Sequence, residues 1–155
     1  MTVARTTIIL IELNGCDSMC LEVKHSYTRP KEGRRIRYKL VLKKDGKYYN
    51  SWSVFNVGVR RGDTEYKIGE KTIARLNGTE YYGDAGLHVL PDKKTALEYL
   101  KWRSGLGAGL PEIDYPKYVL LKGYANKFIV GGIDERSGIP SETWEEFTPI
   151  EEVVV

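Results

Sequence analysis

Apolar and β-branched residues alternate with polar residues in short runs along most of the chain, and this period of two is typical of strands. A first pair of runs covers residues 6–13 and 19–24 around Asn14-Gly15. A second pair covers residues 36–43 and 47–57 around Asp45-Gly46. Both dipeptides favour tight turns, so each pair predicts an antiparallel hairpin.

Residues 92–103 are the stretch where helical spacing is convincing. Ala96, Leu97 and Leu100 fit one face of a helix, and Asp92 stands where a side chain can cap the first turn. Weaker signals predict a polar, turn-rich meander over residues 60–82 and two short strands over 86–90 and 148–155. Residues 117–124 and 128–130 are predicted to pair as a hairpin. At 155 residues the chain suits a single core. We predict one α+β domain over residues 1–155, mainly an antiparallel sheet of hairpins with one principal helix.

Within the 36–43 run, two faces are expected to differ sharply. Ile36, Tyr38, Leu40 and Leu42 fall on one side of a strand, and the other side carries Arg37, Lys39, Val41 and Lys43. The pattern predicts one buried face and one basic face in water.

Charge is unevenly distributed behind a net charge of +3. Residues 21–61 hold twelve Lys and Arg and three acids, whereas residues 134–155 hold seven acids and one Arg. A basic strand pair with aromatic rings can follow a phosphate backbone and stack bases, so nucleic acid, with DNA as the expected polymer, is the predicted partner. The predicted nucleic-acid-binding residues form one exposed surface: Arg34, Arg35, Arg37, Lys39, Lys43, Lys44, Lys47, Arg60 and Arg61. The alternative is a solvated basic face that pairs with the acidic tail.

Location and assembly are constrained only in part by the sequence. The chain has no apolar run near the roughly 20 residues that cross a bilayer, and its start lacks a signal-peptide pattern, so we expect a soluble, cytoplasmic protein without a membrane partner. Cys16 and Cys20 are too few for a disulfide framework and are interpreted as core thiols. A homodimer is compatible with the sequence.

Glu80, Asp84 and His88 form the first candidate catalytic cluster. They lie close together around the 86–90 strand, and together they could act as acid and base, with Glu80 and Asp84 holding a divalent metal, Mg²⁺ or Mn²⁺. Lys71 and Arg75 could meet a phosphate there. The alternative for His88 is a hydrogen-bonded structural histidine.

Glu22-Val23-Lys24 is the second candidate cluster. Residues two apart on a strand share a face, and metal-dependent nucleases pair a metal-binding carboxylate with a lysine in this way. Glu12 or Asp17 would supply the further carboxylate. The alternative is that Glu22 and Lys24 are solvated strand residues.

The order Glu65 to Glu70, Gly86 to Leu90 and Ala96 to Tyr99 resembles a small domain of unknown function found in phages, large viruses and some pentapeptide-repeat proteins. That domain reads Y-x-V-G-E, then C-x-x-G-I-H-F-F, then E-A-x-x-Y, and the likeness covers roughly residues 36–153. This sequence has Gly83 or Asp84 where the family often has cysteine. The family implies no activity.

Two further resemblances concern the overall composition and size of the chain and one strand-to-helix connection. In its composition, which lacks glutamine, and in its size, the chain resembles small proteins of filamentous viruses of hyperthermophilic archaea. Some of those proteins are nucleases. The step from Gly86 to Tyr99 resembles one in ADP-ribosyltransferases, but the expected His-Gly pair is missing. We therefore expect a viral or mobile-element accessory protein that acts on nucleic acid, with metal-dependent DNA cleavage as the candidate activity. The alternative is a non-enzymatic module that binds or modulates a host protein.

Overall fold

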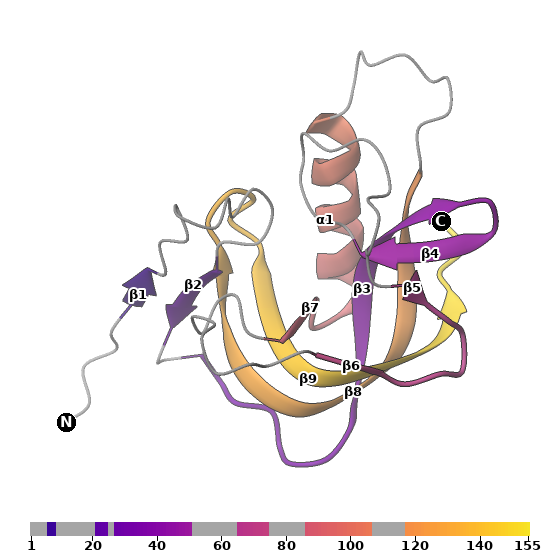
Figure 1. The fold of residues 1–155 in the computed structure, drawn as a ribbon. Coiled ribbons are helices and arrows are strands. Elements are labelled where there is room, and N and C mark those ends of the chain that lie inside the picture. The colour runs from indigo at the N-terminus through magenta and orange to yellow at the C-terminus, as the bar shows by residue number, and fades with distance from the viewer. Residues whose placement is uncertain (1–5, 9–20, 25–26, 51–64, 75–85, 107–116) are drawn as a thin grey trace.

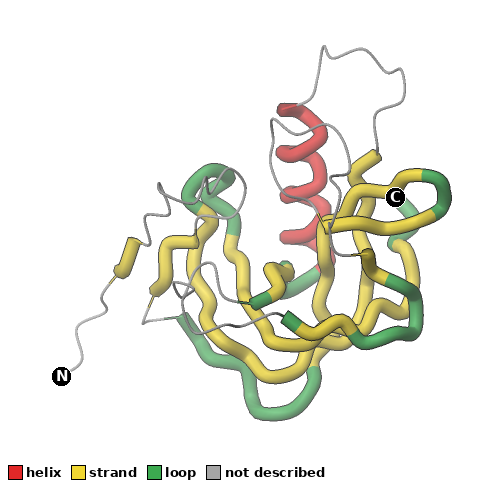
Figure 2. Tube along the Cα trace, viewed as in Figure 1, coloured by secondary structure: helices red, strands yellow, loops and turns green. Residues whose placement is uncertain are grey.

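The computed structural model describes residues 6–8, 21–24, 27–50, 65–74, 86–106 and 117–155. These residues form nine strands and one helix (Figures 1 and 2). The elements are β1 (Thr6–Ile8), β2 (Leu21–Lys24), β3 (Arg35–Lys44), β4 (Lys47–Asn50), β5 (Glu65–Tyr66), β6 (Thr72–Ile73), β7 (Leu87–Val89), α1 (Lys93–Leu106), β8 (Lys117–Asp134) and β9 (Pro140–Glu152). Strand pairing is antiparallel throughout this part of the chain. The predicted α+β class, mainly antiparallel sheet with one helix, is therefore confirmed for the described residues.

α1 begins where the sequence predicts and extends three residues beyond the predicted end. The carboxylate of Asp92 accepts a hydrogen bond from the backbone N–H of Thr95 at 2.7 Å, which satisfies one of the free amides of the first turn. No helix in the described part of the chain has the length and apolar character needed to cross a membrane.

β8 is the central strand of the sheet. It pairs with β3 and β2, and with β9 along much of its length, and Figure 1 shows β8 and β9 curving together beneath α1. The predicted hairpin between 117–124 and 128–130 is wrong, because these residues belong to one strand. The residues between the two predicted strands form a β-bulge and not a turn. Lys127 has a positive φ of 61°, and the β8–β9 register shifts between Phe128 and Val130. The strand therefore bends there without reversing its direction.

A bridge between two distant residues closes the sheet into a ring. Tyr38 of β3 and Leu90, which follows β7, exchange backbone hydrogen bonds of 3.1 and 2.7 Å. Because β7 also pairs with β9, and β9 with β8, backbone pairing runs from β3 through β8, β9 and β7 back to β3. Side chains that point into this ring are covered by the other strands.

The ring divides the core into two clusters. The inner cluster includes Val41, Leu121, Trp144 and Phe147, all at most 1% exposed. The outer cluster joins α1 to the sheet and contains Leu40, Leu90, Ala96, Tyr99 and Leu120. β3 therefore contributes to both clusters with alternate residues.

The predicted basic face of β3 is wrong for Lys39 and Val41. Lys39 is 1% exposed and Val41 is fully buried, because this face of β3 points into the closed ring. The ammonium of Lys39 donates a 2.8 Å hydrogen bond to the carbonyl oxygen of His88 and lies 5.2 Å from the centre of the Tyr66 ring. Burial lowers the pKa of Lys39 from 10.5 to about 7.

Candidate functional site

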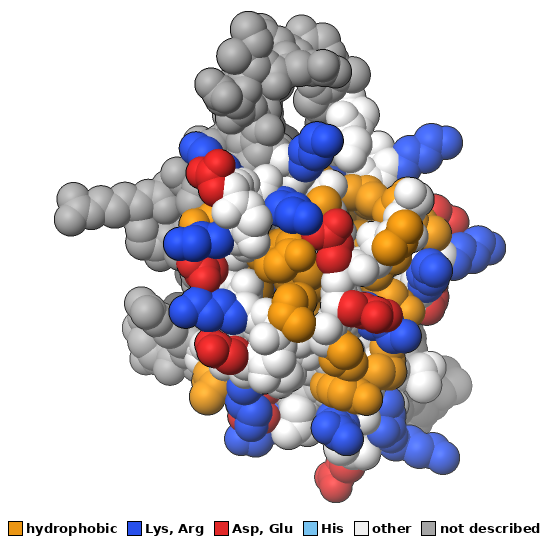
Figure 3. Space-filling view, turned by 90° about the vertical axis from the view of Figure 1, so that its right-hand side faces the viewer, with side chains coloured by type: hydrophobic (Ala, Val, Ile, Leu, Met, Phe, Trp, Pro, Cys, Tyr) orange, Lys and Arg blue, Asp and Glu red, His pale blue; other side chains and the backbone are white. Residues whose placement is uncertain are grey.

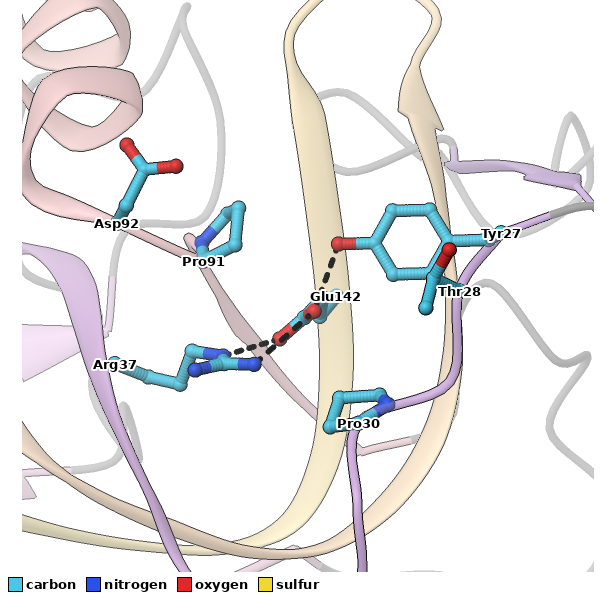
Figure 4. A pocket seen from close by; sticks show the side chains of 7 residues that line it. All are labelled: Tyr27, Thr28, Pro30, Arg37, Pro91, Asp92 and Glu142. Atoms are coloured by element: carbon cyan, nitrogen blue, oxygen red, sulfur yellow. Dashed lines mark hydrogen bonds and ion pairs between the residues drawn. The ribbon is translucent and has the colours of Figure 1, made fainter.

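A cavity of about 580 Å³ lies where the 27–30 segment, β3, β9 and the start of α1 meet (Figure 4). Its lining is Tyr27, Thr28, Pro30, Arg37, Pro91, Asp92 and Glu142. The volume is in the range of roughly 300–1,000 Å³ found for small-molecule sites, and the hollow is widely open to solvent. Two prolines supply apolar walls, and charged or hydroxyl groups supply the rest.

Glu142 is the buried anchor of this cavity. Its side chain is 2% exposed and accepts hydrogen bonds from Arg37 Nε at 2.5 Å, from the Tyr27 hydroxyl at 2.7 Å and from Trp144 Nε1 at 2.9 Å. Figure 4 shows Arg37 and Tyr27 approaching the carboxylate from opposite sides. A buried charge is tolerated when paired and hydrogen-bonded in this way, so Glu142 joins three separate parts of the chain.

The guanidinium of Arg37 keeps donors for another ligand. Nε and Nη2 face Glu142, with Nη2 at 3.5 Å from Oε2, and Nη1 donates to the carbonyl oxygen of Ile36 at 2.9 Å. A guanidinium has five N–H groups, so within the described residues one on Nη1 and one on Nη2 have no acceptor. The side chain is 14% exposed, and it lies 5.4 Å from the centre of the Trp144 ring. Arg37 is therefore fixed in place while part of its donor fork faces the cavity.

Tyr27 closes the cavity on the side of the 27–30 segment. Its ring stacks on Phe128 at a centroid distance of 6.4 Å and covers Gly131 so closely that a Cβ there would overlap the ring. Burial, followed by the hydrogen bond to Glu142, raises the pKa of the Tyr27 phenol, which therefore stays protonated and donates at neutral pH.

A second cavity, of about 420 Å³, adjoins the first at Pro30. Its lining combines cations with aromatic rings, notably Arg29, Lys31, Lys127, Phe128 and Trp144. The guanidinium of Arg29 lies 5.4 Å from the centre of the Phe128 ring, within cation–π range. Trp144 and Glu142 stand two residues apart on β9, so neighbouring positions of one strand face the two cavities.

Basic residues continue beyond the second cavity. A smaller cavity of about 170 Å³ is lined by Arg34, Lys71, Tyr124, Asn126, Glu146 and Thr148. Arg34 lies 4.2 Å from the centre of the Tyr124 ring, while Lys71 and Lys127 lie 3.5 and 3.8 Å from Glu146. The hydrogen bond from Asn126 lowers the pKa of Glu146, with the two lysines adding to the effect. Some of the positive charge here is thus balanced by an acid.

The predicted single positive surface is divided by the fold. Arg34, Lys44 and Lys47 are exposed, Arg35 is half-buried, and Lys39 is buried. Arg37 pairs with Glu142, and Lys43 pairs with Glu152 at 2.8 Å. Figure 3 shows one face of the molecule where Lys and Arg side chains are interspersed with Asp and Glu. Arg60 and Arg61 lie outside the described residues.

The first predicted catalytic cluster is described only at His88, on β7. The backbone carbonyl oxygen of His88 accepts the hydrogen bond from Lys39, and Thr143 is the residue opposite His88 on β9. Glu80, Asp84 and Arg75 lie outside the described residues, and Lys71 is exposed beside Glu146. The cluster therefore stays a prediction.

The second predicted cluster lies on β2, where Glu22 is opposite Ile133 of β8. The side chains of Glu22 and Lys24, together with Glu12, Asp17 and both cysteines, lie outside what the structure describes. Within the described residues, no group of three or more His, Cys, Asp or Glu is placed to hold a metal ion. Mg²⁺ or Mn²⁺ binding thus stays a prediction that rests on residues elsewhere in the chain.

The sequence interpretation missed Tyr27, Phe128, Trp144 and Glu142 as site residues. One signal was present: Glu142 and Trp144 share a face of a strand, and a carboxylate beside an apolar ring needs a partner when buried. The partner itself, Arg37, is 105 residues away.

Comparison with known proteins gives no relative for this chain: no family model, no curated protein and no solved structure matches it.

Proposed function

We propose that this chain binds single-stranded nucleic acid along the surface formed by residues 27–34, Lys127, Phe128 and Trp144. The observation that supports this most directly is the second cavity, which Arg29, Lys31 and Lys127 line together with the half-buried ring of Phe128. Cations that follow a phosphate backbone, next to rings that stack bases, are the usual equipment of single-strand binders. The partner is the nucleic acid predicted from the sequence, but the proposed binding surface is centred on residues 27–34 and not on β3.

Few cations lie along the proposed binding surface, so the bound stretch of nucleic acid is expected to be short. Arg29, Lys31 and Arg34 lie along one segment and are exposed, and the exposed Lys127 of β8 lines the same cavity as Arg29 and Lys31. Glu32 and Glu145 also line the cavity. Phosphate contacts are therefore few, and we expect a shallower dependence on salt than the twelve cations of residues 21–61 would give.

The test is fluorescence anisotropy of a labelled oligothymidine strand, titrated with the protein at several salt concentrations. Affinity should fall as salt rises, and the double change Arg29→Glu with Lys31→Glu should weaken binding at least about tenfold and flatten the salt dependence. The matched control is Lys44→Glu with Lys47→Glu at the β3–β4 turn, which changes charge equally and should have little effect.

Two results would overturn the proposal. One is the absence of binding at low salt, which would favour the alternative of a protein-interaction module. The other is a loss of affinity in the Lys44 and Lys47 variant with none in the Arg29 and Lys31 variant, which would place the interface at the β3–β4 turn.

A further inference from the structure

The cavity of about 580 Å³ offers a donor pair and an acceptor from different parts of the fold. Arg37, on β3, presents two N–H groups that have no acceptor among the described residues. Asp92, before α1, uses Oδ1 to cap Thr95, and its Oδ2 accepts no hydrogen bond within the described part of the chain. A complementary ligand therefore carries two adjacent acceptors and at least one donor.

Guanine fits this requirement better than the other bases. Its O6 and N7 are adjacent acceptors that suit a guanidinium fork, which is the commonest base-specific contact of arginine. Its N1–H and N2–H₂ are adjacent donors that suit a carboxylate. Cytosine also has two adjacent acceptors, O2 and N3, but N4–H₂ is its one donor group, and thymine has the single donor N3–H. Adenine has no two adjacent acceptors, so among the four bases guanine alone combines a pair of adjacent acceptors with a pair of adjacent donors.

The rest of the cavity suits a flat ring joined to a strand. Pro30 and Pro91 provide apolar surface for its faces, and Pro30 also lines the second cavity, where the neighbouring nucleotide would meet Phe128. Glu142 is fully engaged by Arg37, Tyr27 and Trp144, so it acts as a positioning residue for the Arg37 fork.

We propose that this cavity binds a guanine base, with Arg37 donating to O6 and N7 and Asp92 accepting from N1–H and N2–H₂. The inference rests on the proposed function, because the base would belong to a bound single strand. A free guanosine nucleotide carries the same base, and the experiment separates the two sources.

The experiment compares oligothymidine strands that differ in one central base, by fluorescence anisotropy. The strand with guanine should bind at least about fivefold tighter than plain oligothymidine, since a good bidentate pair contributes about 1–3 kcal/mol. Inosine, which lacks the N2 amino group, and 7-deazaguanine, which lacks N7, should each lose most of this preference. Guanosine monophosphate, measured by calorimetry, should bind more weakly than the strand.

The variants assign the two contacts. Asp92→Asn keeps the size and the cap of α1, and it should remove the preference for guanine over inosine. The control Glu98→Gln removes one negative charge from the exposed side of α1 and should keep that preference. Arg37→Lys keeps a charge beside Glu142 but loses the fork, so the preference for guanine over 7-deazaguanine should vanish. Should Arg37→Lys fail to fold in a thermal melt, Asp92→Asn alone decides.

The outcomes separate this inference from the proposed function. Equal affinity for all central bases, or a preference for adenine or cytosine, would overturn the guanine assignment and leave strand binding intact. Binding of guanosine monophosphate without strand binding would overturn the proposed function and support the cavity as a nucleotide site. Binding of neither would overturn both.

Discussion

Both ends of β3 carry cations, but their surroundings differ. At the first end, Arg37 is anchored to a buried carboxylate and Lys39 is enclosed by the ring of strands. At the second end, Lys43 pairs with Glu152 while 39% of its side chain is exposed, and Lys44 is exposed. Tyr38, which lies between Arg37 and Lys39, forms the backbone bridge to Leu90, so the ring of strands closes at the first end of β3. Alternation along a strand therefore shows which residues share a face, and tertiary pairing decides whether that face meets water.

Removing Glu142 should give the largest effect. Glu142→Ala would remove the acceptor of the buried Trp144 N–H and of two half-buried donors, the Arg37 guanidinium and the Tyr27 hydroxyl. Breaking a buried pair by removing one partner costs about 3–5 kcal/mol. The free energy of unfolding, measured by urea titration, should fall by that amount, and Glu142→Gln should lose less because it keeps an acceptor. A loss below about 1 kcal/mol for the alanine variant would contradict burial of this pair.

Lys39 should make stability depend on pH. Its pKa is about 7 in the folded chain and 10.5 ordinarily, so the unfolded chain binds more protons between these values and stability rises with pH across that window. Below about pH 7 the burial cost of the charge is fully present. Lys39→Met should remove this rise, which amounts to at most a few kcal/mol. The measurement is the urea midpoint from pH 6 to 9.5, below the ordinary phenol pKa of 10.0, above which Tyr27 and Tyr66 would ionise in the unfolded chain and lower the stability.

A matched control for this prediction is Lys67→Met, because Lys67 has a 61% exposed side chain. Its stability should follow the same pH dependence as the parent chain. If Lys39→Met keeps the rise between pH 7 and 9.5, then another group causes it and the burial of Lys39 is not its source.

Tyr27 tests a smaller part of the same network. Tyr27→Phe keeps the stacking on Phe128 and removes one hydrogen bond to a charged acceptor. Such a bond contributes about 1.5–3 kcal/mol, and the Arg37 and Trp144 donors remain on Glu142, so we expect a loss near the lower end of that range. Chemical denaturation measures it. An unchanged free energy of unfolding would mean that the hydroxyl finds water as an equal partner.

Much of the fold could be predicted from local patterns. The helix from Lys93 was recognisable by its apolar spacing and its Asp92 cap, and β3 by its alternation. The ring could not be predicted, because it depends on the Tyr38–Leu90 bridge between residues far apart in sequence. β8 was misread because the positive φ at Lys127 marks a bulge, and the same residues also suit a turn.

Of the candidate site, the sequence predicted some of the cations but neither the cavities nor the residues that pair with those cations. Arg37 was recognisable as a cation on a strand, but nothing near it in sequence identifies Glu142 as its partner. Phe128 was placed in a short predicted strand, 128–130, and Trp144 was not singled out in the sequence; in the fold Trp144 is 1% exposed. Its edge toward the second cavity is visible only when β8, β9 and the 27–34 segment are in place.

The smallest effect is expected at the second end of β3, where Glu152→Ala removes the partner of Lys43. Glu152 accepts hydrogen bonds from Lys43 at 2.8 Å and from the Tyr48 hydroxyl at 2.9 Å, but its side chain is 32% exposed. Water can replace both contacts, and exposed ion pairs contribute little net stability, so Tm should change by no more than about 3 °C. Added salt should reduce even this difference, because exposed pairs are screened whereas the Arg37–Glu142 pair is not. Thermal melts of Glu152→Ala and Glu142→Ala at low and high salt measure the contrast. Equal losses in the two variants would mean that the closed ring does not shield the first end of β3, and the contrast between the ends would then have to be abandoned.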